Sequence, residues 1–160
     1  MRAKSGFTLV EILIVMVVLG ILAAIVIPQF TAASTEAKES NLISSLQSVR
    51  SQIELYKIQH NDNLPGTRAD VDFETAMTSK TNRYGEVGAT AAHRFGPYLK
   101  SIPANPFVDV AAAYDVEEEA GTTGLGGGNS GWHFDTSTGW FQADDDRVNA
   151  LDNNKPHADY

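Results

Sequence analysis

The feature that most constrains this chain is an apolar run of 21 residues near its amino terminus. Between residues 7 and 27, the strongly polar side chains are those of Thr8 and Glu11. As an α-helix, this run would be about 32 Å long at 1.5 Å per residue, which matches a hydrocarbon core about 30 Å thick. The run therefore predicts a helix that can cross a membrane.

The charges around the run predict its orientation. Arg2 and Lys4 precede it, so the preference of basic residues for the cytoplasmic side places the residues after Pro28 on the far side of the membrane. An ordinary secretory signal would end at a small-residue cleavage site. Here the apolar run continues beyond Ala23 and Ala24, so we expect the apolar segment to be retained.

Glu11 is out of place in a plain membrane anchor. A carboxylate near the centre of a membrane-spanning helix costs roughly 2.5 to 3.5 kcal/mol, so it calls for a partner or a function. No lysine or arginine lies between Lys4 and Lys38. Cleavage between Gly6 and Phe7 would create an α-amino group four residues before Glu11, about one helical turn away. We expect this amine to pair with Glu11 in the same chain or in a neighbouring copy.

Residues 6–11 read Gly-Phe-Thr-Leu-Val-Glu and are followed by the apolar run and Pro28. This pattern resembles the class III signal of the type IV pilin and pseudopilin superfamily over about thirty residues. The resemblance implies that a membrane-embedded prepilin peptidase cuts after Gly6 and methylates Phe7. It also implies that Glu11 and Pro28 are the family's glutamate and its helix-kinking proline.

Several residue types in this segment have a direct physical reading. Gly6 has no Cβ and lets the backbone lie extended against a protease. Pro28 removes a backbone donor and clashes with the carbonyl group near Ala24, so it bends or locally melts the helix. Gly20 and Ala24 form a small-xxx-small pair that allows two helices to approach closely. Chance in an alanine-rich segment is an equal alternative for this pair.

A second, one-sided helical pattern follows the membrane segment. Its apolar residues are spaced as one stripe of a 3.6-residue period: Leu42, Leu46, Val49, Ile53 and Tyr56. We expect this stripe to pack against a carboxyl-terminal sheet. The predicted helix runs from residue 7 to residue 60 with a bend at Pro28, and we expect it to stop at the turn formers of residues 61–66. The predicted parts are a cleaved basic leader at 1–6, a membrane and filament-core helix at 7–29, an amphipathic helix half at 30–62 and a globular head at 63–160.

The head is expected to be an α+β domain. Asp70 is a candidate N-cap for a short helix at residues 71–78. Three prolines at residues 97–106 predict an extended connector without helix, which also resembles the connector of major pseudopilins. The aromatic segments 131–135 and 139–143 predict a β-hairpin. Residues 98–102 and 107–110 are candidates for further short strands, giving a small antiparallel sheet laid on the long helix.

Acidic residues dominate the end of the chain. Residues 109–160 contain 11 Asp and Glu against 2 Lys and Arg, and the whole chain has a formal charge of −8. This balance argues against a nucleic-acid partner, because phosphate binding needs clustered cations. We favour a solvated acidic surface. Calcium is the alternative, as in many major pseudopilins, and its candidate ligands are Asp115, Glu117, Asp144, Asp145 and Asp146.

Other sites are rejected on spacing. Gly126, Gly128 and Gly131 match a G-x-G-x-x-G motif, but we expect no strand before it and no helix after it, so the segment is interpreted as a surface loop. The histidines are too far apart in sequence for a paired metal motif and are expected on the surface or in strands. The chain has no cysteine and no nucleophile-elbow motif, so the sequence predicts neither a thiol nucleophile nor a Ser-His-Asp triad. We expect no catalytic residues, no enzymatic activity and no cofactor apart from the calcium alternative.

The resemblance implies a structural subunit that polymerises into a type II secretion pseudopilus and helps to export folded proteins across the outer membrane. Its partners would be copies of itself, the prepilin peptidase, the inner-membrane assembly machinery and minor pseudopilins. It would be a single-pass inner-membrane protein before it joins a periplasmic or extracellular filament. A major or minor type IV pilus subunit for adhesion or motility is the alternative. A monomeric, membrane-anchored binding domain is a second alternative.

Overall fold

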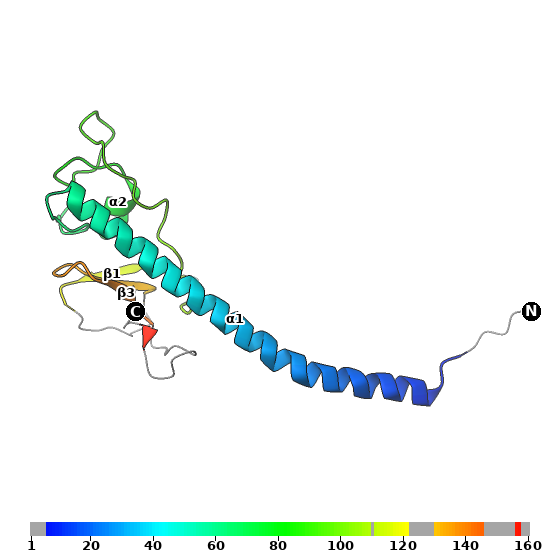
Figure 1. The fold of residues 1–160 in the computed structure, drawn as a ribbon. Helices are drawn as coiled ribbons and strands as arrows, with labels where there is room; N and C mark the ends of the chain where they lie inside the picture. Colours follow the sequence, from blue (N-terminus) through cyan, green and yellow to red (C-terminus); the bar gives the residue numbers. More distant parts are fainter. Residues whose placement is uncertain (1–5, 110, 122–129, 146–155, 158–160) are drawn as a thin grey trace, which may run out of the picture. The chain divides into compact units, whose positions relative to one another are not determined.

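A computed structural model describes residues 6–109, 111–121, 130–145 and 156–157. Five elements follow one another along the chain (Figure 1): α1 (Leu9–Gln59), α2 (Phe73–Thr78), β1 (Val116–Glu119), β2 (Trp132–Asp135) and β3 (Phe141–Ala143). A long amino-terminal helix and a small sheet make up an α+β arrangement, as the sequence predicts. The chain divides into two compact units, residues 1–37 and residues 38–160, and α1 contributes to both.

The first unit consists of the amino-terminal part of α1. The helix continues through Pro28 without interruption, so this proline neither ends nor melts it. Close to the proline, the Thr31 hydroxyl group donates to the carbonyl oxygen of Ile27 at 3.1 Å. Every side chain from residue 6 to residue 34 is exposed.

The second unit has its core on the predicted stripe of α1. Leu42, Leu46, Val49, Ile53 and Tyr56 are all at most 3% exposed. They belong to one apolar cluster whose other buried members come from the head: Val71, Phe73, Ala76, Met77, Ile102, Trp132, Phe134, Phe141 and Ala143. Full burial of such a leucine, isoleucine or phenylalanine side chain contributes about 1.5 to 3 kcal/mol. The predicted packing of this stripe against the carboxyl-terminal sheet is therefore confirmed.

The sheet has the strand order β1-β2-β3 and is mixed. β2 and β3 form the predicted antiparallel hairpin, with Trp132 opposite Ala143 and Phe134 opposite Phe141. β1 runs parallel to β2, with Val116 opposite Trp132. The expectation of a purely antiparallel sheet is wrong because β1 is joined to β2 by the segment 120–131, and parallel strands require a crossover connection rather than a tight turn.

Two other local predictions differ from the structure. Within the described residues, the segments 98–102 and 107–109 form no strand. The backbone N–H groups of Tyr98 and Leu99 donate to the carbonyl oxygen of Met77 at 2.8 and 2.9 Å, so they pair with the end of α2 rather than with a strand. The connector around the three prolines contains no helix, as predicted, and includes bends and turns.

The cap of α2 also differs from the prediction. The helix is capped by Asp72, whose Oδ1 accepts the Thr75 N–H at 2.7 Å. Asp70 is engaged elsewhere, since it receives the Arg68 Nε at 3.2 Å. The Arg68 and Val71 backbones form an isolated bridge that keeps this stretch outside the helix. Capping by Asp70 is therefore wrong, and the helix begins two residues later than predicted.

Candidate processing and assembly site

The peptide bond between Gly6 and Phe7 lies outside regular structure. α1 begins at Leu9, and the residues immediately before it are neither helical nor in a strand. Phe7 is 79% exposed, and a Cβ built on Gly6 would meet no atom within 4 Å. The fold of the chain therefore does not require glycine at residue 6, and the bond is open to an extended backbone-binding protease cleft.

Thr8 caps the start of α1. Its Oγ1 accepts the backbone N–H of Glu11 at 3.3 Å, and its carbonyl oxygen accepts the N–H groups of Glu11 and Ile12 at 3.2 and 3.3 Å. A threonine followed three residues later by glutamate is the sequence of a capping box. The sequence reasoning missed this role of Thr8, although the Thr-x-x-Glu spacing before an apolar run signals it.

Glu11 stands in the first turn of α1, where the helix dipole favours a negative charge. Its side chain is exposed, and within the described part of the chain it takes part in no ion pair. In this uncut chain the nitrogen of Phe7 is a peptide amide, so it carries no charge. The predicted pairing between the Phe7 amine and Glu11 stays a prediction.

The apolar side chains of the first unit are exposed in the part of the chain that the structure describes. Large hydrophobic side chains from Phe7 to Ile27 are between 44% and 81% exposed. A Cβ at Gly20 would meet nothing within 4 Å, and Ala24 one turn later is also exposed. By length and composition, α1 is the one helix in the described residues that could cross a membrane. An apolar helix of this kind needs lipid or other helices around it.

Comparison with known proteins agrees with these features. Residues 1–27 match the family described as the prokaryotic N-terminal methylation motif. The type II secretion system core protein G of Aeromonas hydrophila is 31% identical over 106 residues, which cover 66% of this chain and 69% of the relative. The chain belongs to the type II secretion system core protein G family. The predicted resemblance to the major pseudopilins is thereby confirmed.

Other members of the family match over the same share of the chain. The core protein G of Vibrio cholerae is 30% identical over 67% of this chain and 68% of the relative. That of Pseudomonas aeruginosa is 33% identical over 66% of this chain and 70% of the relative. No solved structure matches the chain. The family assignment therefore rests on sequence similarity that extends well beyond the amino-terminal motif.

Two of the calcium candidates are buried within the head of this family member. Asp144 is fully buried and accepts the Ser130 hydroxyl at 2.6 Å. Asp145 is 3% exposed; its Oδ1 lies 2.7 Å from His157 Nδ1. The Oδ2 of Asp145 accepts the Asn105 side-chain N–H at 2.9 Å. The interpretation of a solvated acidic surface is wrong for these two residues because the head covers them and supplies hydrogen-bond partners.

The remaining calcium candidates are Asp115, Glu117 and Asp146. Asp115 and Glu117 are exposed, at and just after the entry to β1, and Asp146 lies outside the described residues. In the part of the chain that the structure describes, no group of three or more His, Asp or Glu side chains is arranged to hold a metal ion. Calcium binding stays a prediction from the sequence.

The glycine-rich segment and the histidines need corrections. A strand, β1, does precede the glycines, contrary to expectation, but β2 follows, so a dinucleotide fold is still rejected. Gly126 and Gly128 lie outside the described residues. The expectation that the histidines lie on the surface or in strands is wrong for His60 and His157. Both are at most 1% exposed and lie outside the strands. Each packs against an aromatic ring and forms a hydrogen bond to a residue distant in the sequence.

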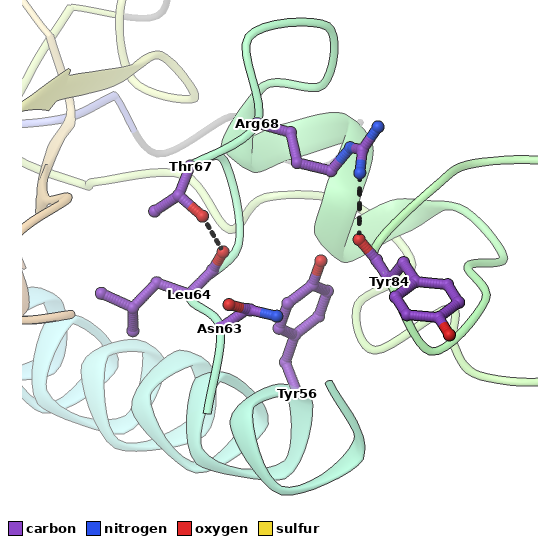
Figure 2. Close-up of a pocket in the computed structure, with 6 residues that line it drawn as sticks. All are labelled: Tyr56, Asn63, Leu64, Thr67, Arg68 and Tyr84. Carbon is purple, nitrogen blue, oxygen red and sulfur yellow. Dashed lines mark hydrogen bonds between the residues drawn. The ribbon is translucent and has the colours of Figure 1, made fainter. Parts of the chain in front are cut away.

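One cavity of about 330 Å³ lies in the head near the end of α1. Figure 2 shows the residues around it: Tyr56, Asn63, Leu64, Thr67, Arg68 and Tyr84. Arg68 donates to the Tyr84 carbonyl oxygen at 3.3 Å, and Thr67 donates to the Leu64 carbonyl oxygen at 2.8 Å. The six lining residues include no His, Asp, Glu or Cys. No motif in the sequence marks this cavity.

Proposed function

We propose that this chain is the structural subunit that polymerises into a type II secretion pseudopilus and so helps to export folded proteins across the outer membrane. The observation that carries the proposal is the contrast between the two parts of α1. From residue 38 onward its apolar stripe is buried by the head, whereas its apolar residues before Pro28 are exposed. The second pattern suits a helix that is first surrounded by lipid and then by other copies of itself.

Processing is the first step of the proposed function. Residues 7–29 hold the chain in the inner membrane with residues 1–6 in the cytoplasm and the head on the periplasmic side. The prepilin peptidase then cuts after Gly6 and Phe7 is methylated. The exposed, non-helical backbone at this bond and the methylation motif over residues 1–27 support this step.

Assembly is the second step. Copies leave the lipid through the inner-membrane assembly machinery, and their apolar helices pack together in the filament. Gly20 and Ala24 let neighbouring backbones approach closely, since neither adds bulk to its face of α1. The new α-ammonium group of Phe7 neutralises Glu11 of the same or an adjacent copy. Catalysis has no place in this scheme, and the acidic head stays on the outside of the filament with residues 30–62 beneath it.

Mass spectrometry and electron microscopy of the native protein test this function together. We expect a mature chain that begins with N-methylated Phe7, and short periplasmic filaments that contain it. A mature chain that keeps Met1 would contradict the processing step and favour a monomeric anchored domain. Long surface fibres made of this chain would favour a type IV pilus instead.

A further inference from the structure

Arg50 of α1 is held against the hairpin by two contacts. Its Nε donates to the carbonyl oxygen of Phe141, the first residue of β3, at 2.7 Å. Its guanidinium carbon lies 4.1 Å from the centre of the Trp140 ring. A planar cation stacked on an indole ring at this distance forms a cation–π contact. The guanidinium group is therefore fixed in position before any ligand arrives.

The positive charge of Arg50 has no carboxylate partner among residues 6–109, 111–121, 130–145 and 156–157. Its Nη2 is buried and lacks a hydrogen-bond acceptor there. Glu54, one turn further along α1, is bound instead by Lys57, with 3.1 Å between Nζ and Oε1. Burial lowers the pKa of Arg50. A partly buried guanidinium without an anion is an incomplete arrangement.

Trp140, the ring on which Arg50 stacks, faces solvent. Trp140 is 48% exposed although it is among the largest side chains of the head. Fixing the hairpin to α1 explains the Nε hydrogen bond to Phe141, but it does not explain an indole ring left half in water. Tryptophan and arginine are the residue types most enriched at the energetic centres of protein interfaces.

We propose that Arg50 and Trp140 together receive a carboxylate side chain from an adjacent copy of this chain in the filament. The inference rests on the proposed function, which supplies the second copy. The ligand is an anion because Arg50 offers only N–H donors and positive charge. The Nε of Arg50 already donates to Phe141 and its Nη2 is buried, so a carboxylate from outside the chain would bond the remaining amino group, Nη1, and the exposed indole would cover the ion pair against water.

Charge complementarity identifies a second copy as the source of this anion. Arg2 and Lys4 leave with residues 1–6, so each processed subunit carries 20 Asp and Glu against 10 Lys and Arg. A filament of such subunits repels itself unless its few cations face carboxylates of neighbours. Lys57 and Arg68 already have carboxylates within their own chain. Arg50 is fixed and lacks such a partner in the described residues.

The test compares Arg50→Gln with Lys57→Gln in cells that assemble filaments. Both variants remove one cation from α1, but Lys57 is paired within its own chain. We expect Arg50→Gln to lower the amount of assembled filament at least tenfold while cleavage after Gly6 is unchanged, and Lys57→Gln to assemble within twofold of the natural chain. Equal assembly by the two variants would overturn the inference.

A second measurement separates the interface from a role of Arg50 in folding. A benzoylphenylalanine photo-crosslinker at Gln47, an exposed residue about one turn before Arg50 on α1, should yield a covalent dimer of this chain under light, joined to a peptide that contains Asp or Glu. The dimer should disappear in the assembly-defective Glu11→Gln background. Crosslinks only to another protein, or none while filaments form, would refute the inference. If the unaltered chain itself forms no filament, the proposed function fails instead.

Discussion

The hydroxyl oxygen of Thr8 accepts the backbone N–H of Glu11 at 3.3 Å. Thr8 is thus the N-cap of α1, and the helix begins just beyond the proposed cleavage site. Because Thr8 follows the cut, the cap would survive removal of residues 1–6. The amine created at Phe7 would then lie beside the cap, about one turn before the carboxylate of Glu11. The same short segment would thereby provide the cleavage site, the helix start and the ion pair.

Replacing the cap should disturb the start of the helix. Thr8→Ala removes the oxygen that accepts the Glu11 N–H, and loss of an N-cap costs about 1 kcal/mol. We expect fraying of the first turn and a lower filament yield, because the Glu11 side chain then loses its fixed position. Filament yield, measured after shearing or periplasmic extraction, checks this. Thr8→Ser keeps the hydroxyl and should assemble normally; a Thr8→Ser defect as large as that of Thr8→Ala would contradict the capping role.

Removing the charge of Glu11 should block assembly and spare the earlier steps. Both Glu11→Ala and Glu11→Gln lower the cost of placing residue 11 in lipid, so insertion should be at least as efficient as in the natural chain. Cleavage after Gly6 should continue, but the Phe7 amine would have no countercharge in the packed core. Gel mobility reports cleavage and electron microscopy reports filaments. Normal filaments from Glu11→Gln would show that the pairing is not needed.

His60 should make the stability of the head depend on pH. Its Nδ1 lies 2.8 Å from the Tyr56 carbonyl oxygen and its Nε2 lies 2.9 Å from Thr81 Oγ1. Burial lowers the pKa of His60 below its ordinary value of 6.5, with the backbone hydrogen bonds acting in the opposite direction. The unfolded chain therefore binds a proton more readily than the folded chain. The free energy of unfolding should be largest above about pH 6.5 and fall as the pH drops below this value.

Thermal unfolding of the full chain in detergent micelles between pH 5 and pH 7.5 measures this dependence. His60→Gln should unfold at a lower temperature than the natural chain at neutral pH. Its unfolding temperature should also change much less with pH. His93→Gln is the control, because His93 lies in a loop and is more exposed than the buried His60. If the unfolding temperature of His60→Gln depends on pH as strongly as that of the natural chain, groups other than His60 cause the dependence.

Asp135 should stabilise the hairpin as a carboxylate. Its Oδ1 accepts N–H groups of Gly121 and Ser137 at 2.9 and 2.8 Å, and its Oδ2 accepts the Thr138 hydroxyl at 2.6 Å. Hydrogen bonds from the hydroxyls of Ser137 and Thr138, followed by that from the Gly121 backbone, hold the pKa of Asp135 well below its ordinary value. The carboxylate therefore stabilises the fold above about pH 4, which is the pKa of an aspartate in the unfolded chain. This stabilisation is lost as the pH falls through the pKa of Asp135 in the folded chain.

The matching substitution is Asp135→Asn, which keeps the shape and removes the charge. We expect it to lower the free energy of unfolding at neutral pH by about 2 kcal/mol, typical of a hydrogen bond to a charged group. Chemical denaturation at pH 7 and at pH 3.5 measures the free energy of unfolding of both chains. The difference between Asp135→Asn and the natural chain should be smaller at pH 3.5. An equal difference at both values would mean that the charge contributes nothing.

The helical half of the fold was predictable from local patterns. The apolar stripe from Leu42 to Tyr56 repeats at the helical period and turned out to be the buried face of α1. The hairpin from Trp132 to Ala143 was predictable because aromatic strand formers flank a short turn. In both cases, residues close in sequence carry the whole signal.

The position of β1 was not predictable in the same way. Its residues, from Val116 to Glu119, are mostly acidic, and glutamate is uncommon in strands. The structure places Glu118 Oε1 2.8 Å from the Phe73 N–H, at the start of α2. A contact between residues 45 positions apart thus helps to place the strand, and nothing in the local sequence announces it.

By itself, the sequence determined that the chain begins with an apolar helix containing one carboxylate and preceded by Gly-Phe, and this led to the correct family. Those properties depend on residue type and spacing along a single helix. Only the tertiary structure decided that Asp144 and Asp145 lie buried, that β1 pairs in parallel with β2 and that Arg50 stacks on Trp140. These outcomes depend on which segments, distant in the sequence, come into contact in the head. The periodicity of a sequence indicates which face of a helix or strand is apolar, but it does not indicate which other segment covers that face.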